Sequence, residues 1–342
     1  MRAWILTVVC CATSLLAFSA EPPHDVRKMQ QEMAAGVESA LRWFARHQAK
    51  DGGWQAVDVA PASRADRVLT SLVLTTFRSA GHSEQRGAHA EIVKRGSQWL
   101  LSQAGADGRF GDGIDQAICT RALVDMPKGP NVEALAQRAV DHCVRLQRHD
   151  SGWGAAPGAE VDVASTAWFV VTLKAAEKAG YKVDAKTYQG VTLLLDKLID
   201  EKGRYRPRES ANAVSPDATA AAMVCRFTLG AVSGDRTVDG GVAYLLESIP
   251  SLVPAGKDPD PATWYLGSIA AYHASGELWK AWCAAAAKDV SPKQRKGGPM
   301  DGSPQDKDGS WSATGSVATW GGMEASTALM TLGKIAWFAS GR

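Results

Sequence analysis

Apolar residues recur along the chain with helical spacing, in paired segments that differ in how fully apolar they are. Segment 26–46 carries hydrophobic residues on one face and charged residues on the other, as amphipathic surface helices do. Segment 163–171 is apolar on nearly all sides, which is typical of a buried helix. Strand-like alternation is rare. The pattern predicts an all-α protein with an outer layer of amphipathic helices and an inner layer of buried ones.

A short turn motif follows the amphipathic helices and sets a repeat. It joins a Gln to Asp-Gly and then to an aromatic residue, as in the stretch from Gln48 to Trp54. Complete or worn copies lie at Gln103–Phe110, Gln147–Trp153, Gly203–Tyr205 and Gln305–Trp311. Trp54 and Trp311 are 257 residues apart over five intervals, a period of about 51 that fits two helices and two loops. We therefore expect one domain over 21–342, built from six helical hairpins that start near 27, 90, 130, 185, 237 and 278.

The second helix of each hairpin carries residues typical of a helix start and, in most hairpins, of a helix end. An acid stands near each start, at Asp66, Asp115, Asp162, Asp217, Asp260 and Glu324. A glycine stands near most ends, at Gly81, Gly180, Gly230, Gly276 and Gly341. The turn aromatics Trp54, Phe110, Trp153 and Trp311 are predicted to be buried between outer helices. Segment 289–310, rich in Pro, Gly, Lys and Asp, is predicted to be a mobile surface loop.

The first 20 residues indicate export. Arg2 precedes an apolar run that ends near Phe18, and small residues offer a cleavage site near Ala20. The alternative is an uncleaved anchor, although the run is short for a span. We expect a secreted or periplasmic protein with a signal peptide over 1–20 and no membrane span after its removal.

Charge and cysteine content exclude several classes of partner. The net charge is only +2 and no basic cluster with interleaved aromatics occurs, so nucleic-acid binding is not expected. Four cysteines follow the leader, at Cys119, Cys143, Cys225 and Cys283. None forms a CxxC pair, so no metal or redox motif is indicated, and we expect neither a metal nor another cofactor. We favour buried single thiols, while export also permits disulfides.

The second repeat carries a family resemblance. Its residues Arg95-Gly96, Trp99-Leu100, Gln103, Gly108 and Phe110 resemble the QW repeat of squalene and oxidosqualene cyclases, which is related to repeats of protein prenyltransferase β-subunits. The resemblance extends over nearly the whole mature chain, most clearly in repeats one, two, three and six. It implies an α/α toroid (an α6/α6 barrel) with a central cavity, in which the QW residues brace the outer ring.

The catalytic motifs of that superfamily are not intact. Cyclases protonate an alkene with Asp-x-Asp-Asp-Thr-Ala, and the matching stretch 162–167 keeps Asp162 but has Ala164 and Ser165 in place of the two other acids. Prenyltransferases bind zinc through Asp, Cys and His. The residues Asp217, Cys225 and His273 lack a recognisable ligand spacing. The Gly-Cys-Gly-Glu-Gln motif of related thioester domains is absent.

Candidate site residues follow from the geometry of a ring. Because the inner helices run parallel, their acidic starts gather at one mouth. Helix capping explains these acids by itself. The functional alternative is a rim in which Asp162 and Asp217 are catalytic candidates. The proposed ligand site comprises Asp162, Asp217, Trp264, Tyr265 and Glu324. For the aromatic pair, core packing is the simpler interpretation, and a cavity wall that binds a ligand is the alternative.

Three functions remain open. The first is a binding toroid for an apolar small molecule or a protein partner, without classical cyclase chemistry. The second is a terpenoid cyclase or prenyltransferase-like enzyme with altered acids. The third is a carbohydrate-active toroid with paired carboxylates. The sequence names neither the ligand nor the oligomeric state.

Overall fold

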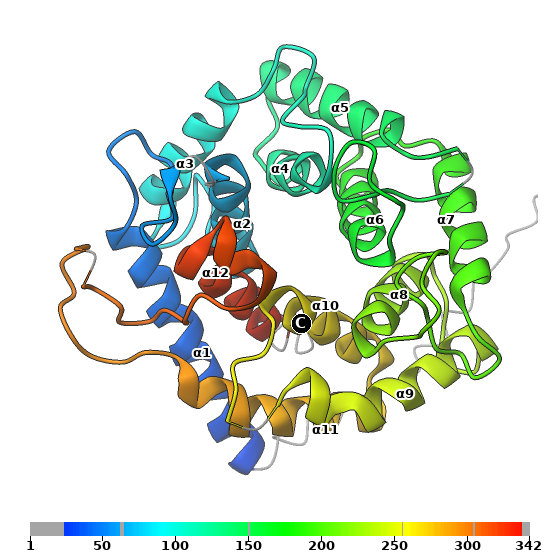
Figure 1. Cartoon of the computed structure of the whole chain (residues 1–342). Coiled ribbons are helices and arrows are strands. Elements are labelled where there is room, and N and C mark those ends of the chain that lie inside the picture. Colours follow the sequence, from blue (N-terminus) through cyan, green and yellow to red (C-terminus); the bar gives the residue numbers. More distant parts are fainter. Residues whose placement is uncertain (1–23, 62–64, 150, 255, 304, 337–342) are drawn as a thin grey trace, which may run out of the picture.

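The computed structural model describes residues 24–61, 65–149, 151–254, 256–303 and 305–336, and in these residues the chain forms two concentric rings of helices (Figure 1). The outer helices are α1 (His24–Arg46), α3 (Ala90–Ser102), α5 (Pro130–Arg145), α7 (Ala185–Leu198), α9 (Arg236–Leu252) and α11 (Gly276–Ala285). The inner helices are α2 (Asp66–Ser79), α4 (Ile114–Val124), α6 (Val163–Lys178), α8 (Pro216–Thr228), α10 (Pro261–Ala274) and α12 (Gly322–Ile335). The all-α prediction is confirmed: the described part of the chain contains isolated β-bridges but no strand.

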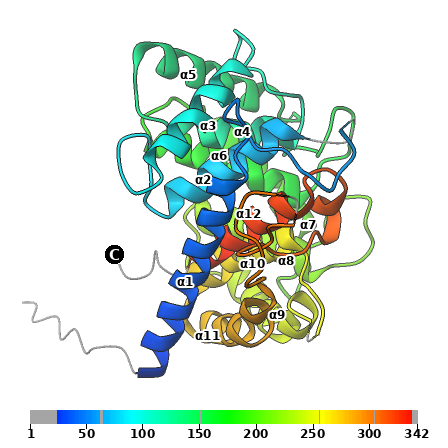
Figure 2. The same cartoon turned by 90° about the vertical axis from the view of Figure 1, so that its left-hand side faces the viewer.

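The inner ring is closed by contacts between the two ends of the chain. Each inner helix packs on the next, and α12 packs on α2. Outside this seam, α1 lies along α12 (Figure 2). None of the described helices is both long and apolar enough to cross a membrane. The expected signal peptide over 1–20 lies outside the described residues.

Burial distinguishes the two rings as the hydrophobic pattern predicted. Every residue of α12 is buried, as is the run from Val68 to Phe77 in α2. The outer helix α5 buries only a stripe at Ala136, Ala139, Val140 and Cys143, the i, i+3, i+4, i+7 spacing of one helical face. The inner helices therefore form the core, and the outer helices cover it.

The turn aromatics are buried, as predicted. Trp54, Phe110, Trp153 and Trp311 are each at most 3% exposed. The backbone N–H of Trp153 donates to Thr166 Oγ1 on the following inner helix, and Trp54 pairs in the same way with Thr70. The Trp153 indole N–H also donates to the carbonyl of Cys143 at the end of α5 (2.8 Å). Each such turn thus joins an outer helix to an inner one.

In two of the four expected copies, the repeat Gln braces the outer ring, as the family resemblance implied. Gln48 donates to the carbonyls of Gly52 in its own turn and Ile92 in the next outer helix, and Gln147 does the same with Ser151 and Thr187. Among the described residues, the Gln103 side chain hydrogen-bonds to its neighbour Ser102 instead of bridging two segments.

In repeats two and six a Gln from another position makes this bridge. Gln116, on inner helix α4, accepts from Phe110 N–H and donates to the carbonyls of Gly108 and Ala139. In repeat six the bridging residue is Gln294 rather than Gln305, and its amide donates to Gly36 and Gly309.

Segment 289–310 is a surface loop only in part: residues 296–301 are exposed, as predicted, but the two ends of the segment pack against the ring. Gln294, Asp306 and Ser310 within it are buried. Asp306 forms an ion pair with Arg46 at 2.6 Å, and its carbonyl accepts the indole N–H of Trp43. Both partners belong to α1, so this segment fastens the last repeat to the first.

Helix ends and thiols also follow the sequence pattern. Gly81, Gly180, Gly230 and Gly276 have positive φ angles where helices end, whereas Gly341 lies outside the described residues.

The thiols expected to be single, those of Cys119, Cys143, Cys225 and Cys283, are free and buried. Burial raises the pKa of each to about 12, which makes them poor nucleophiles.

Candidate functional site

The six acids lie at one end of the inner ring, in the first turn of their helices or just before it. Two of them are N-caps: Asp162 accepts from Ser165 N–H at 2.7 Å, and Asp260 accepts from Thr263 N–H at 2.9 Å. The Ser165 hydroxyl also donates to Asp162. In α8 the N-cap is Ser215, and Asp217 stands within the first turn. Capping thus accounts for Asp162 and Asp260 but not for every acid of the rim.

Asp217 has an acidic neighbour. Burial raises the pKa of its carboxyl, and the charge of Asp260 on the next inner helix raises it further, while a hydrogen bond with Thr263 opposes the shift. Asp162 is not among the groups that shift it. The interacting acids at this part of the rim are therefore Asp217 and Asp260.

Glu324 is the most perturbed carboxyl of the rim. It is only 1% exposed, and neither of its oxygens has a hydrogen-bond partner of normal geometry among the described residues. Burial raises its pKa to about 8. The Glu324 backbone amide opposes this shift, the charge of Asp58 adds to it, and the Val57 amide opposes it. Burial between α12 and the loop that precedes α2 therefore favours the neutral form of Glu324.

The two neighbouring aromatic residues Trp264 and Tyr265 on α10 pack against different parts of the ring. Trp264 is fully buried, stacks on Trp282 of α11 at 5.3 Å between ring centroids, and donates to the Met330 carbonyl. Tyr265 instead stacks on Trp168 of α6 at 5.0 Å. Trp264 therefore packs inner helix against outer helix, whereas Tyr265 fills the centre of the ring.

An apolar pocket of about 370 Å³ opens at the mouth formed by the helix starts. Ile114, Asp115 and Ala262 from first helical turns stand at its rim. Its deeper lining is Val68, Leu72, Ile118, Trp168 and Leu329. Segment 315–320 covers one side through Val317 and Trp320. Asp115 is the only acid among the described residues that line it, and none of the five predicted ligand-site residues is in contact with this pocket.

A polar hollow of about 350 Å³ adjoins the pocket and shares Ala65, Val68 and Asp115 with it. Its other lining residues are Asp66, Arg67, Trp99 and Gln103. The mouth thus combines an apolar depression with a polar margin that holds two carboxylates. Asp66 and Asp115 belonged to the predicted acidic rim, but the sequence did not distinguish them from the other four acids.

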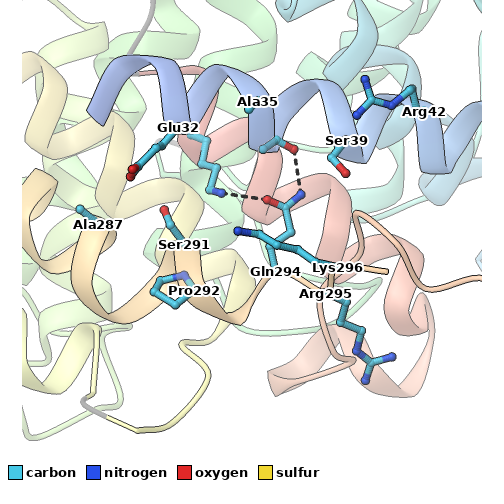
Figure 3. Close-up of a pocket in the computed structure, with 12 residues that line it drawn as sticks. Glu32, Ala35, Ser39, Arg42, Ala287, Ser291, Pro292, Gln294, Arg295 and Lys296 are labelled. Atoms are coloured by element: carbon cyan, nitrogen blue, oxygen red, sulfur yellow. Dashed lines mark hydrogen bonds between the residues drawn. The ribbon is translucent and has the colours of Figure 1, made fainter. Parts of the chain in front are cut away.

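A second cavity, of about 450 Å³, lies beneath α1 and holds a buried amine. Gln294 sits at its centre, with its amide directed at α1 (Figure 3). Its Oε1 accepts from Lys334 Nζ at 3.2 Å, and this ammonium lies 4.5 Å from the centre of the Trp311 ring. Lys334 is 1% exposed and forms no ion pair with any described residue. Burial lowers its pKa to about 7, and Lys296 contributes to the shift.

The position in repeat four that is equivalent to Lys334 carries a cation with an ion-pair partner, which Lys334 does not have among the described residues. Arg226 follows Thr219 by seven residues, as Lys334 follows Thr327, and Arg226 likewise lies over the turn aromatic, here Tyr205. Arg226 is paired with Asp196 at 2.6 Å. The equivalent cation in repeat six has only an amide as partner. No local sequence signal distinguishes these two positions.

The zinc set considered from the sequence does not assemble among the described residues. His273 stacks on Phe227, and Cys225 is buried. The described groups that do meet with metal-ligand spacing are Glu38, His82 and His89, which the sequence analysis did not single out.

The two concentric rings of helices define an α/α toroid. No protein-family model and no curated protein sequence matches the chain. Among solved structures, the type II terpene cyclase MstE from Scytonema aligns with a TM-score of 0.62 and 14% identity, over 91% of this chain and 99% of that one. Unsaturated glucuronyl hydrolase from Bacillus sp. GL1 aligns with a TM-score of 0.60 and 13% identity, over 89% and 96%. These likenesses concern the fold alone.

Proposed function

We propose that the protein binds an amphipathic small molecule in the mouth pocket. The apolar part of the ligand occupies the space between Leu72, Ile118 and Trp168, and a hydroxyl or amino group reaches Asp115. The observation that carries this proposal is a largely apolar pocket of about 370 Å³ whose polar lining residues are Asp115 at its rim and Ser316 in the covering segment. Its size and composition are typical of small-molecule sites.

Binding is favoured over terpenoid cyclisation because of where the acids lie. Alkene protonation requires a neutral carboxylic acid that faces the substrate. Glu324 and Asp217 have raised pKa values but do not line the pocket, and Asp162 caps α6. Ser165 stands where the cyclase motif has an acid, and it donates a hydrogen bond to Asp162.

A filled-pocket variant tests this proposal. Ala262 stands at the rim and is half-buried, so Ala262→Trp places an indole in the pocket without enlarging a core residue. The control is Leu193→Trp on the exposed face of α7, where the side chain is 51% exposed. We expect the neutral probe N-phenyl-1-naphthylamine to bind the native chain and the control, and to bind Ala262→Trp at least about tenfold more weakly. Equal binding by all three proteins would contradict the proposal.

Asp115 is tested separately with an alkylamine and an alkane diol. Asp115→Asn is expected to weaken binding of the alkylamine and to leave binding of the neutral diol unaffected, because only the charged amine depends on the carboxylate charge. A parallel loss of both would indicate a structural role for Asp115.

Carbohydrate chemistry is the second candidate, because Asp66 and Asp115 share the polar hollow with Trp99. Paired carboxylates beside an aromatic ring suit a glycosidic substrate. Oligosaccharide hydrolysis that is lost in both Asp66→Asn and Asp115→Asn would establish this activity in place of simple binding.

Export is proposed from the leader over 1–20. Intact mass of protein recovered outside the cytoplasm should correspond to a chain that starts near Glu21. A mass that includes Met1 would contradict cleavage.

A further inference from the structure

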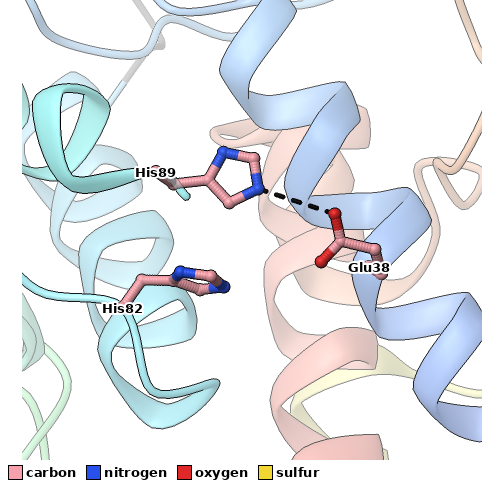
Figure 4. Close-up of side chains that lie close together, drawn as sticks. All are labelled: Glu38, His82 and His89. Atoms are coloured by element: carbon pink, nitrogen blue, oxygen red, sulfur yellow. Dashed lines mark ion pairs between the residues drawn. The ribbon is translucent and has the colours of Figure 1, made fainter. Parts of the chain in front are cut away.

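Three side chains with metal-ligand chemistry converge at the seam of the ring (Figure 4). Glu38 projects from α1, His82 follows the end of α2, and His89 immediately precedes α3. One ligand atom from each lies within 4.8 Å of the other two, and His89 Nε2 lies 3.7 Å from Glu38 Oε1. Residues that span 51 positions of the sequence thus form one cluster.

The local fold holds the two imidazoles in place. Gly81, with φ of 93°, ends α2 and turns the chain, so that His82 N–H bonds back to the Phe77 carbonyl at 3.0 Å. Both imidazole rings contact the Phe77 ring, with centroids 6.3 and 5.2 Å away, and they meet each other edge to face at 4.9 Å. The cluster is therefore supported by packing from a core residue.

Polar atoms in the cluster lack protein partners. His89 Nε2 and His82 Nδ1 are buried and have no hydrogen bond among the described residues. Buried polar atoms in folded proteins are nearly always satisfied. The distance of 3.7 Å between His89 Nε2 and Glu38 is too long for a hydrogen bond. The other contact of Glu38 is an ion pair with Arg42 at 3.5 Å, in which both side chains are about half exposed, so it contributes little.

Two imidazoles and one carboxylate are a donor set that suits Zn²⁺ and similar divalent transition metals. Ligand atoms around one such ion are roughly 3–3.5 Å apart, so small side-chain rotations close the present spacing. A cavity of about 250 Å³ adjoins the cluster, with Glu38 and His82 in its wall among largely apolar residues. A metal with three protein ligands keeps one coordination position open for water or another small ligand.

We propose that Glu38, His82 and His89 form a binding site for Zn²⁺ or a similar divalent transition metal at the seam of the ring. The ion joins α1 to the α2–α3 connection, next to the place where α12 closes on α2. This site is separate from the mouth pocket, so the two proposals stand or fall independently.

Isothermal titration of the chelator-treated full chain with Zn²⁺ tests the site, and Co²⁺ absorption reports the donor set. We expect one ion per chain and a melting temperature that rises with Zn²⁺ concentration. Glu38→Gln, His82→Gln and His89→Gln should each bind Zn²⁺ at least about tenfold more weakly. Glu38 is half exposed and His89 makes no side-chain cap, so these two changes should leave the fold intact.

The matched control is His142→Gln. His142 is as buried as His89 and also contacts a carboxylate, Asp112 at 3.3 Å, but it has no third ligand. Its loss should leave Zn²⁺ affinity unchanged. No Zn²⁺ uptake by the native chain, or equal affinity in the native chain and the three site variants, would overturn the proposal.

Discussion

The side-chain oxygen of Thr166 on α6 accepts the backbone N–H of Trp153, the aromatic residue of the preceding turn, at 3.1 Å. The same contact joins Thr70 to Trp54, Thr219 to Tyr205 and Thr327 to Trp311. It satisfies a buried N–H where an irregular turn meets an inner helix. A Thr at one helical position thus determines how each of these hairpins closes.

Removal of this acceptor should destabilise the protein. Thr166→Val keeps the shape of the side chain but leaves the Trp153 N–H buried without a partner, which costs about 1–3 kcal/mol. Thr166→Ser keeps the hydroxyl and should cost less. Urea denaturation of both variants measures the difference. Equal stability of the two variants would show that the hydroxyl is dispensable.

Loss of the whole Trp153 side chain should lower the stability of the protein more than loss of the Thr166 hydrogen bond does. Its indole is 1% exposed and stacks on Phe169 at 4.7 Å between ring centroids. Trp153→Ala is expected to lower the free energy of unfolding by about 3–5 kcal/mol. Leu193→Ala, at an exposed position on α7, is the control and should change little. A thermal melt of Trp153→Ala that overlays the native curve would contradict a bracing role for the turn.

Gly333 should not tolerate alanine, although it lies within helix α12. In an exposed helix, Gly→Ala stabilises by about 1 kcal/mol. Here an added Cβ would lie 2.2 Å from the Trp264 indole nitrogen, so the ring must move and its bond to Met330 is lost. We expect net destabilisation of about 1–3 kcal/mol by chemical denaturation. An increase in stability would show that Trp264 has room to move.

Glu324 should make stability decline as pH rises. Its pKa is about 8 in the folded protein, against 4.5 when exposed, so its contribution is complete below pH 4.5 and is lost as pH rises through 8. Within that window one such group changes the free energy of unfolding by about 1.4 kcal/mol per pH unit. Glu324→Gln should remove this slope between pH 5 and 7. Parallel profiles for the variant and the native protein would mean that Glu324 is ionised in the fold.

Lys334 should make stability rise with pH, mainly above pH 7. Its pKa is about 7 in the folded protein, against 10.5 when exposed, so its contribution is present above pH 10.5 and is lost as pH falls through 7. Lys334→Met should flatten the rise in stability between pH 7 and 10. Lys280→Met, at a side chain that is 73% exposed, is the control and should keep the native profile. If both variants keep it, Lys334 is charged throughout.

Local pattern was sufficient to predict the helices, their order and the burial of the turn aromatics. Helix periodicity, N-caps such as Asp162 and the terminal Gly180 depend on near neighbours in the chain, so their signals survive in a single sequence. The same local reading failed at the two ends of segment 289–310. Its polar composition hid the buried Asp306 and Gln294, whose partners on α1 lie more than 250 residues away.

The sequence by itself therefore determined a ring of helical hairpins with acids at one end. Only the tertiary structure decided which of these groups meet. It placed Asp115 at the edge of a largely apolar pocket and buried both Glu324 oxygens, which have no hydrogen bond of normal geometry among the described residues. It packed Trp264 between an inner and an outer helix. It also brought Glu38 of α1 to His82 and His89. The physical reason is that such convergence depends on how helices pack and on ring closure. These are sums of many weak contacts between distant segments, and no short stretch of sequence records them.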